Sequence, residues 1–325
     1  MDYSSLLMKF NKFSGFPSVR SSMTSPYAII MGKASGDRTM GQRRIIAGSR
    51  ILITGASQGI GKALAEATAA RGANVLVCAR QIDLLLSLAQ QIRAKGGIIE
   101  VIRADITSPR DRQEMVETAE KAFGGLDILV NNAGIGATGH FADCGPERLR
   151  QLMEVNFFGV TETTRAFLPM LKKGNKPAIV NISSIAGKRG IPARSEYSAS
   201  KFAVQGFSEA LRAELAKDGI DVIVVCPGLT QTNFSQNMIE QKALLQLDHM
   251  RGMSAEDVAA LTLKSIEKGY HETCLTLNGK MLVLVSRFIP WLADLVVKRK
   301  VRGLFKEEIA ARKQPRPMSA ANRGG

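Results

Sequence analysis

A tyrosine and a lysine four residues apart, Tyr197 and Lys201, are the side chains whose types and spacing most directly suggest chemistry. The residues around them predict a helix, in which side chains at positions i and i+4 lie on the same face. An ammonium group beside a phenol favours the phenolate, so we expect Lys201 to lower the pKa of Tyr197. A tyrosine tuned in this way can donate or accept a proton near neutral pH. The pair therefore predicts a proton-transfer site, and an exposed tyrosine beside a solvated lysine is the alternative for so short a pattern.

A turn with three glycines is the second feature that suggests chemistry. Gly55, Gly59 and Gly61 lie between an apolar run at 50–54 and a helical pattern at 62–71. Glycine lets the backbone approach a ligand closely, and the free N–H groups at a helix N-terminus attract phosphate. The spacing is G-x-x-x-G-x-G rather than the commoner G-x-G-x-x-G, but its place after the first predicted strand indicates dinucleotide binding. Tight packing of the helix on the strand is the alternative.

Strands and helices alternate along most of the chain. Short apolar runs predict strands that are buried on both faces, as in a parallel sheet covered by helices. The predicted fold class is α/β, with a doubly wound, Rossmann-type, mostly parallel sheet in a single domain and a ligand beyond the carboxyl ends of the strands. The predicted strands are 50–54, 74–79, 98–103, 126–131, 178–183 and 220–226, and the predicted helices are 62–71, 83–95, 109–123, one or two within 146–172, and 196–217.

The end of the second predicted strand indicates which dinucleotide is bound. An acidic residue at this place binds a ribose 2′-hydroxyl, whereas a cation accommodates a 2′-phosphate. Here the strand ends with Cys78 and Ala79, and Arg80 follows. Because arginine can bind phosphate bidentately, NADP(H) is favoured over NAD(H). The alternative is that Arg80 is a solvated residue at the start of the next helix, and Gln58 supplies no second cation in the glycine turn.

Composition and charge limit the classes of function. The chain has 325 residues, 45% of them hydrophobic, which is enough for one large α/β domain. Its four cysteines and three histidines lack metal-binding spacing, which predicts reduced thiols, an intracellular setting and no metal site. Of the net charge of +15, residues 1–46 carry +5 and residues 287–325 carry +7. The basic character therefore lies in the tails, and no nucleic-acid partner is expected.

Six short motifs, in order within residues 48–235, resemble those of the short-chain dehydrogenase/reductase superfamily. They are T-G-A-S-Q-G-I-G at 54–61, N-N-A-G at 131–134, Asn156 within E-V-N-F-F-G, I-S-S at 182–184, Y-S-A-S-K at 197–201 and P-G-L-T-Q-T at 227–232. The chain is identified as a member of the single-domain branch, and its tail resembles that of the hydroxysteroid-dehydrogenase-like members. The resemblance implies an NAD(P)-dependent enzyme with a small-molecule substrate.

The resemblance also implies catalytic roles for four residues. Ser184, preferred to Ser183 because it lies thirteen residues before Tyr197, would hydrogen-bond the substrate carbonyl oxygen. Tyr197 would donate its proton to that oxygen as hydride arrives. Lys201 would lower the pKa of Tyr197 and hold the nicotinamide ribose, and Asn156 would hold a water that links Lys201 to solvent. These roles are coherent, because an oxygen that becomes an alkoxide needs donors aimed at it.

A larger set of cofactor-binding residues follows from the same resemblance. Asp105 resembles the family's adenine contact, although it also fits a simple helix cap, and Asn131 and Ala133 resemble the segment that lines the nucleotide. The implied set is Gly55, Ser57, Gln58, Gly59, Ile60, Gly61, Arg80, Asp105, Ile106, Asn132, Ala133, Gly134, Tyr197, Lys201, Pro227, Gly228, Thr230 and Thr232.

After Thr232 the match to the family loosens. In this family the segment that follows lies over the substrate, and a hydrophobic loop excludes water, so we expect an apolar or lipid-like carbonyl or secondary alcohol. Ordinary helix packing explains the same stretch. The chain also lacks the T-G…D-G-G ending of many reductases of acyl-carrier-bound ketones, although a 3-oxoacyl-carrier-protein reductase-like activity stays an alternative. The apolar residues of the stretch are Phe234, Met238, Ile239, Leu244, Leu245, Leu247, Met250 and Met253.

An alternative of another class is a non-catalytic NADP-binding sensor or scaffold. The complete set of Asn156, Ser184, Tyr197 and Lys201 argues against it.

The predicted domain organisation is a catalytic unit between two extensions. Residues 1–46 are expected to be an N-terminal extension, either a disordered arm or the result of an upstream start codon chosen over Met40, with organelle targeting as the weaker alternative. Residues 47–286 form the dinucleotide-binding and catalytic domain, and 287–325 form a basic amphipathic extension.

Residues 287–306 fit an interfacial membrane helix, a helix over the substrate pocket or a subunit contact. We expect a cytoplasmic protein, with peripheral membrane association through this segment as the alternative. The resemblance implies a homodimer or homotetramer.

Overall fold

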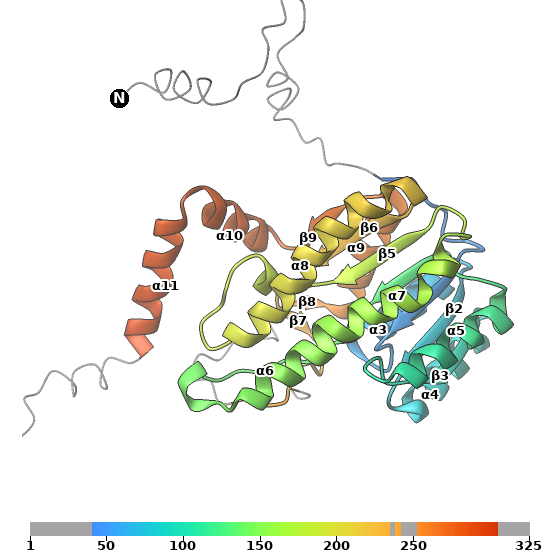
Figure 1. Cartoon of the computed structure of the whole chain (residues 1–325), viewed down its shortest axis with the longest axis horizontal. Coiled ribbons are helices and arrows are strands. Elements are labelled where there is room, and N and C mark those ends of the chain that lie inside the picture. Colours follow the sequence, from blue (N-terminus) through green and yellow to red (C-terminus); the bar gives the residue numbers. More distant parts are fainter. Residues whose placement is uncertain (1–40, 235–237, 242–251, 305–325) are drawn as a thin grey trace, which may run out of the picture. The chain divides into compact units, whose positions relative to one another are not determined.

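The computed structural model describes residues 41–234, 238–241 and 252–304, which form a doubly wound α/β domain (Figure 1). Its centre is a seven-stranded parallel sheet in the order β3-β2-β1-β4-β5-β6-β9. The predicted fold class is therefore confirmed. The strands of the sheet are β1 (Arg50–Thr54), β2 (Asn74–Ala79), β3 (Ile98–Arg103), β4 (Ile128–Asn131), β5 (Ala178–Ile182), β6 (Asp221–Cys226) and β9 (Glu272–Cys274), and a separate short pair is β7 (Thr230–Gln231) with β8 (Met253–Ser254).

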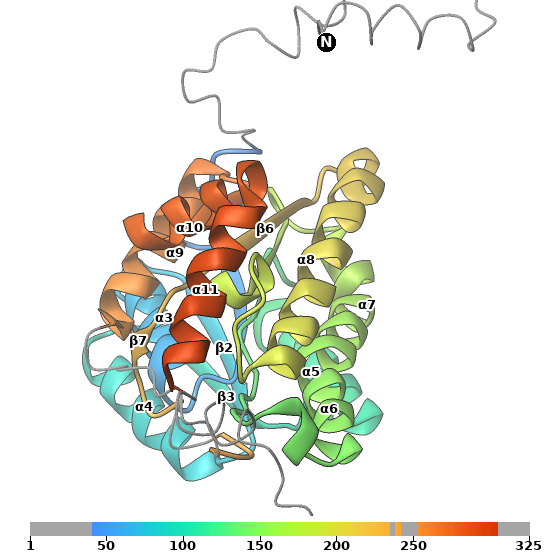
Figure 2. The ribbon, with the colours of Figure 1, turned by 90° about the vertical axis from the view of Figure 1, so that its left-hand side faces the viewer.

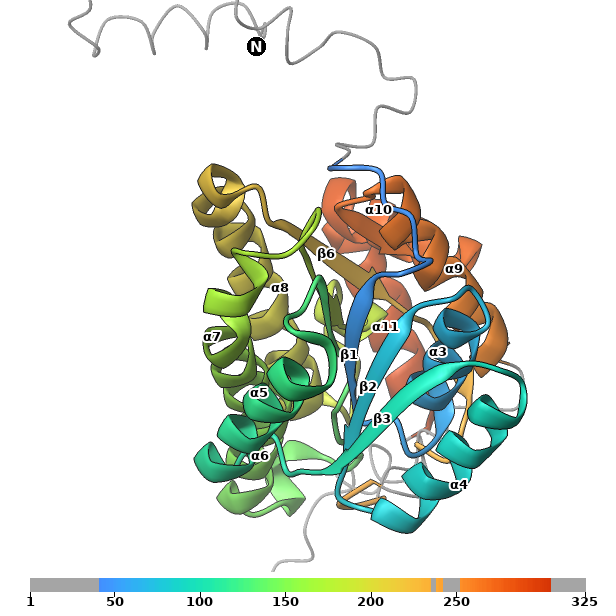
Figure 3. The ribbon, with the colours of Figure 1, turned by 90° about the vertical axis from the view of Figure 1, so that its right-hand side faces the viewer.

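Helices cover both faces of the sheet, as Figure 3 shows from the β3 edge. One face carries α3, α4 and α9, and the other carries α5, α7 and α8. At the β9 end of the domain, α10 and α11 follow one another, with α11 nearest the viewer in Figure 2. The helices are α3 (Gly59–Ala69), α4 (Ile82–Ala94), α5 (Pro109–Phe123), α6 (Pro146–Met153), α7 (Gly159–Leu171), α8 (Ser195–Leu215), α9 (Ala255–Lys268), α10 (Leu277–Phe288) and α11 (Pro290–Leu304).

Alternating residues of the strands divide the core between the two faces. Ile51 and Ile53 of β1 pack in the cluster beneath α3, α4 and α9, whereas Leu52 packs in the cluster that includes Phe167 of α7. All of these side chains are fully buried. Both faces of a strand are thus apolar, which explains why the strands read as continuous hydrophobic runs.

The structure refines two local features of the prediction. The helix expected at 62–71 begins at Gly59, because the second and third glycines of the turn form its first turn. The segment 146–172 contains α6 and α7 joined by a π-helical turn, Glu154–Phe158. A π turn inserts one extra residue into a helix and is frequent at functional sites. The turn signal at Ser108-Pro109 is confirmed, since the Ser108 hydroxyl accepts a hydrogen bond from the Asp111 N–H.

The folded domain starts before the predicted boundary at residue 47. Arg44 is buried, and its guanidinium donates to the carbonyl oxygens of Lys176 and Pro177 and to the Asp221 carboxylate at 2.7 Å. Ile46 belongs to the core beneath α3. Residues 41–46 are therefore part of the domain, because they pack at the amino ends of the strands.

Several expectations lie outside the described residues. They concern residues 1–40, the apolar side chains at Leu244, Leu245, Leu247 and Met250, and residues 305–325. In the described part of the chain, no helix is long and apolar enough to cross a membrane. Likewise, no group of His, Cys, Asp and Glu in that part is arranged to hold a metal ion. All four cysteines are free thiols.

We predict that Arg44→Met lowers the free energy of unfolding by about 3 kcal/mol, because it leaves the Asp221 carboxylate without its cation in a partly buried place. Urea unfolding followed by circular dichroism measures the change. The neighbouring Arg43, which is exposed, provides the matched control Arg43→Met. Equal unfolding midpoints for the two variants would show that residues 41–46 do not stabilise the domain.

Candidate active site

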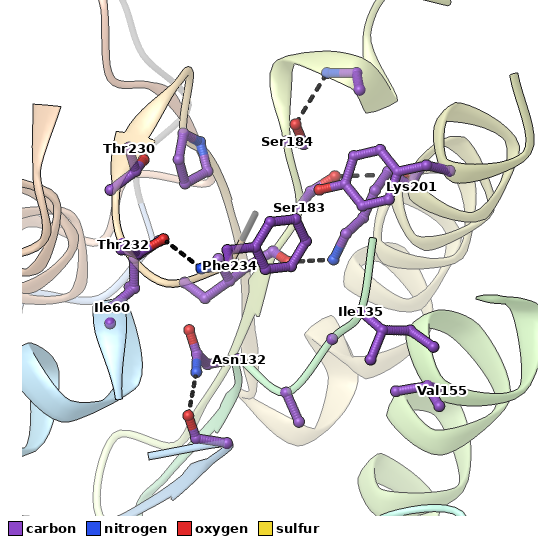
Figure 4. A pocket seen from close by; sticks show the side chains of 18 of the residues that line it. Ile60, Asn132, Ile135, Val155, Ser183, Ser184, Lys201, Thr230, Thr232 and Phe234 are labelled. Atoms are coloured by element: carbon purple, nitrogen blue, oxygen red, sulfur yellow. Dashed lines mark hydrogen bonds between the residues drawn. The ribbon is translucent and has the colours of Figure 1, made fainter. Parts of the chain in front are cut away.

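A cavity of about 820 Å³ lies at the carboxyl ends of the strands (Figure 4). It is lined by residues that follow β1, β2, β3, β4, β5 and β6, and chain order reverses between β1 and β4. Ligands of open α/β sheets bind at this kind of place. The cavity brings together Ser184, Tyr197, Lys201 and every residue of the predicted cofactor set except Gly61.

The glycine turn after β1 is held against the end of β4. Gly55 has a positive φ of 67°, and a Cβ there would lie 2.7 Å from the Cα of Ala133. The Asn132 side-chain amide donates to the carbonyl oxygens of Thr54 and Gly55 at 2.9 and 3.1 Å. The predicted role of Gly61 is corrected by the structure. A Cβ at Gly61 would lie 2.4 Å from the Gly55 carbonyl oxygen, so Gly61 permits close helix–strand packing and does not line the cavity.

The start of α3 offers a place for an anion. Gln58 occupies the N-cap position without a side-chain hydrogen bond to the helix, and the first turn of α3 contains no acidic residue. The first N–H groups of a helix that has no capping side chain need an acceptor, and phosphate is well suited to them. Ser57, Gln58, Gly59 and Ile60 line the cavity here. These residues fit the pyrophosphate of a dinucleotide.

Arg80 and Asp105 lie at the same end of the cavity. Arg80 is exposed, lines the cavity, and has no ion-pair partner among the residues that the structure describes. One Asp105 carboxylate oxygen accepts hydrogen bonds from the Thr107 N–H and hydroxyl at 2.9 and 2.8 Å. Asp105 thus caps the turn before α5 and also faces the cavity.

Tyr197 and Lys201 lie in the first turns of α8, and both are buried. The Lys201 Nζ lies 6.0 Å from the centre of the Tyr197 ring and donates to the Ile182 carbonyl oxygen at 3.1 Å. Burial disfavours the ammonium form and lowers the pKa of Lys201 to about 8. The Ser184 hydroxyl lies at the end of β5 and accepts from the Ala186 N–H, whereas Ser183 donates to the Lys201 carbonyl oxygen.

The pKa of Tyr197 departs from the predicted direction. Burial raises this pKa, and a hydrogen bond with Ser184 and the positive charge of Arg194 oppose the rise only in part. The expectation of a lowered pKa is therefore wrong for these surroundings. Desolvation outweighs the nearby charges, among which the positive charge of Arg194 opposes the rise.

Asn156 lies in the π turn between α6 and α7 and is completely buried. Its amide oxygen accepts from the Ile135 N–H at 2.8 Å, and its amide nitrogen donates to the Ile135 carbonyl and the Ser200 hydroxyl. Asn156 does not line the cavity. It joins the segment after β4 to α8, so it fixes the backbone that borders Lys201.

Asn131 does not belong to the nucleotide-lining segment, which corrects the inference drawn from the family motif. It is buried at the end of β4, where its amide donates to the Thr164 hydroxyl and to Asn181 at 3.0 and 2.8 Å. Asn181 donates in turn to Ser208. This chain of buried hydrogen bonds ties β4 and β5 to α7 and α8.

The substrate end of the cavity is mostly apolar. Phe234 and Met238 of the predicted apolar stretch line it, whereas Ile239 and Met253 do not. The sequence analysis missed Arg194, whose only signal was its position three residues before Tyr197. It also missed the α10 wall, because the family motifs end before that helix. The other unpredicted lining residues of this end include Ile135, Val155, Ile191, Thr276, Asn278, Gly279 and Leu282.

Comparison with known proteins agrees with this geometry. A family model described as short chain dehydrogenase matches residues 49–243. The chain belongs to the short chain dehydrogenase family. It is accordingly an NAD(P)-dependent oxidoreductase with a Rossmann-type nucleotide-binding fold.

Two relatives and one solved structure illustrate the similarity. Dehydrogenase/reductase SDR family member 7B of Mus musculus is 33% identical over 270 residues, covering 81% of this chain and 80% of that protein. Ketoacyl reductase HetN of Nostoc sp. is 30% identical over 260 residues, covering 78% and 89%. The short chain dehydrogenase/reductase of Burkholderia phymatum, solved in complex with NAD, superposes with a TM-score of 0.70 at 25% identity, covering 77% of this chain and 96% of that one.

A buried arginine connects the start of α8 to the segment that covers the substrate end. Arg148 of α6 binds the carboxylates of Glu196, which precedes Tyr197, and of Glu240 at 2.9 Å. The segment 238–241 is also held by the Thr138 N–H, which donates to the Glu240 carbonyl oxygen at 2.8 Å. Arg148 therefore ties α8, which carries Tyr197 and Lys201, to the segment that carries Met238.

We predict that Arg148→Met lowers the free energy of unfolding by about 3–5 kcal/mol, because two carboxylates lose their shared buried cation. The measurement is urea unfolding monitored by circular dichroism. Arg150→Met is the matched control, since the Arg150 side chain on the same helix is 75% exposed. If the Arg148 variant unfolds at the same urea concentration as the control, the ion pairs of Arg148 with Glu196 and Glu240 do not stabilise the domain.

Proposed function

We propose that this member of the family is an NADP(H)-dependent oxidoreductase that interconverts a carbonyl and a secondary alcohol on an apolar or lipid-like substrate. One observation carries the proposal. Ser184, Tyr197 and Lys201 line the same cavity as the glycine turn and the start of α3. A proton donor and a dinucleotide site thus share one space.

The proposed mechanism assigns the proton chemistry to this chain. The bound cofactor supplies or accepts a hydride. Ser184 and Tyr197 would donate hydrogen bonds to the carbonyl oxygen, and Tyr197 would pass its proton to that oxygen as negative charge develops. The raised pKa of Tyr197 favours the protonated phenol that reduction needs.

Two further residues would support the proton transfer. Lys201 would hold the nicotinamide ribose and stabilise the phenolate left behind. Asn156 would hold a water that returns a proton to Lys201, since its amide donates to the hydroxyl of Ser200, the residue directly before that lysine.

The preference for NADP(H) rests on Arg80. Arg80 is an exposed cation at the cavity, directly after β2, and no carboxylate occupies that strand end. Such a cation suits the 2′-phosphate that distinguishes NADP from NAD. The related Burkholderia phymatum structure contains NAD, so the argument depends on this chain's own residues.

An apolar substrate is supported by the lining of the cavity beyond Tyr197. Ile135, Ile191, Phe234, Met238 and Leu282 contribute apolar surface there. Burying such surface against a ligand contributes about 25 cal/mol per Å². A second candidate is reduction of a 3-oxoacyl group, because ketoacyl reductase HetN is among the relatives. A non-catalytic sensor is the third, and the first experiment below separates it from both enzymes.

We also propose a homodimer or homotetramer formed through α7 and α8. Phe158, at the end of the π turn that leads into α7, and Phe202 of α8 are 47% and 44% exposed. Large apolar side chains on adjoining helices are suited to burial in a subunit interface.

We predict that Tyr197→Phe binds NADPH as tightly as the wild type but loses about 10²–10⁴-fold in kcat, the usual contribution of a general acid. NADPH fluorescence measures binding, and NADPH consumption with a panel of aliphatic and steroidal ketones measures turnover. Tyr270→Phe, a tyrosine absent from the cavity lining, is the control. Unchanged turnover in Tyr197→Phe would remove the catalytic assignment, and cofactor binding without turnover of any ketone by the wild type would favour the sensor.

We predict that Arg80→Ala weakens NADPH binding by roughly 10–100-fold and leaves NADH binding unchanged, because only NADPH loses a charge-assisted hydrogen bond. Titration of each variant with both cofactors measures the selectivity. Arg165→Ala, which alters a 75% exposed arginine on α7, controls for the change in net charge. Equal losses for both cofactors would assign Arg80 to general binding rather than to the 2′-phosphate.

A further inference from the structure

The outer side of α10 carries a continuous apolar stripe. Leu277, Met281, Leu284 and Phe288 recur at i, i+4, i+7 and i+11, which is the spacing of one helix face. Every one of these side chains is at least 50% exposed. Single exposed apolar residues are ordinary, but a contiguous exposed face marks an interaction site.

The next helix, α11, has exposed residues at the same spacing, but they change from apolar to cationic along the helix. On α11 the positions i, i+4, i+7 and i+11 are Trp291, Leu295, Lys298 and Arg302, all exposed. The opposite side of the helix holds Ala293, which is buried. The exposed face of α11 therefore begins apolar and ends cationic.

The charge of the two helices selects among partners. Residues 277–304 contain six Lys and Arg residues and one acid, Asp294. The Asp294 carboxylate already binds Arg189 outside these helices. A symmetric contact between two copies of this surface would bring like charges together, because a two-fold interface pairs the same patch on both subunits. An anionic surface has the complementary charge.

We propose that α10 and α11 dock on the surface of an anionic lipid bilayer. The apolar stripe enters the interfacial region, and the cations lie among the negatively charged headgroups. This inference is independent of the proposed reaction. It has a structural consequence, since α10 lines the cavity with Asn278, Gly279 and Leu282 on its other side. Only one helix, roughly 10–12 Å in diameter, separates the cavity from the docked lipid.

The chain provides its own probe for the experiment. Trp291 is the only tryptophan in the sequence, so intrinsic tryptophan fluorescence reports from the proposed surface alone. The full chain is titrated with vesicles of phosphatidylcholine, with and without phosphatidylserine, including lipids with brominated acyl chains. We expect co-sedimentation with the phosphatidylserine vesicles, a blue shift of the emission, and quenching by the brominated lipids. Added salt should weaken the binding.

Matched substitutions test the stripe. Leu284→Glu is expected to lower the apparent affinity for vesicles about tenfold or more. The leucine would be buried in the lipid when the protein docks, and the variant replaces it with a charged side chain. Leu86→Glu on α4 is the control, since Leu86 and Leu284 are both 50% exposed. The Leu86→Glu variant should bind vesicles like the wild type. Titration with NADPH checks that both variants keep a folded cofactor site.

Three results would overturn the proposal. The first is a wild-type chain that does not bind phosphatidylserine vesicles. The second is equal vesicle binding by the Leu284→Glu and Leu86→Glu variants. The third is loss of self-association in Leu284→Glu, measured by sedimentation without lipid, with vesicle binding unchanged, which would assign the stripe to a subunit contact.

Discussion

The close approach of the β1–α3 turn to the end of β4 is the constraint on which the site depends. A Cβ on Gly55 would lie 2.7 Å from the Cα of Ala133, so only hydrogen fits between these strand ends. The Asn132 amide holds the approach by bonding the carbonyl oxygens of Thr54 and Gly55. Backbone therefore lines the cavity where a pyrophosphate fits, and the uncapped start of α3 faces the same space. Gly134 follows Asn132 by two residues in the segment after β4. A Cβ on Gly134 would lie 3.1 Å from Asn156 Oδ1 and 3.5 Å from Lys201 Nζ. The segment after β4 thus borders α8 as well.

Burial governs the electrostatics of Tyr197 and Lys201. Tyr197 and Lys201 are both enclosed, and desolvation disfavours the charged form of each side chain. It raises the pKa of the phenol above its ordinary value of 10.0 and lowers that of the ammonium from 10.5 to about 8, so it separates two pKa values that are similar in water. Arg194 and Ser184 limit the rise for Tyr197, and the Ile182 carbonyl accepts a hydrogen bond from Lys201. Burial therefore favours the protonated phenol, which is the form that a general acid needs.

The rest of the chain encloses this pair from two sides. Arg148 joins Glu196, beside Tyr197, to Glu240 in the segment that covers the substrate end. On the other side α10 presents Gly279 and Leu282 to the cavity while its outer face remains apolar and exposed. One helix therefore serves as a cavity wall and as an outer surface. This arrangement places an apolar exterior next to an apolar interior.

The alternating strands and helices, the parallel sheet and the residues at its carboxyl ends could be predicted from the amino-acid sequence. These follow from local patterns: continuous apolar runs for buried strands, glycines after the first strand, and Tyr197 four residues before Lys201. Only the tertiary structure decided the roles of Gly61 and Asn131, which share motifs with cofactor-lining residues but pack inside the domain. It also decided the direction of the Tyr197 pKa, the buried Arg44 contacts before residue 47, and the α10 wall. The reason is that burial and contacts between distant segments are not local properties. Adjacent residues of one motif can point to opposite sides of the backbone, and the desolvation of a phenol depends on every element that encloses it.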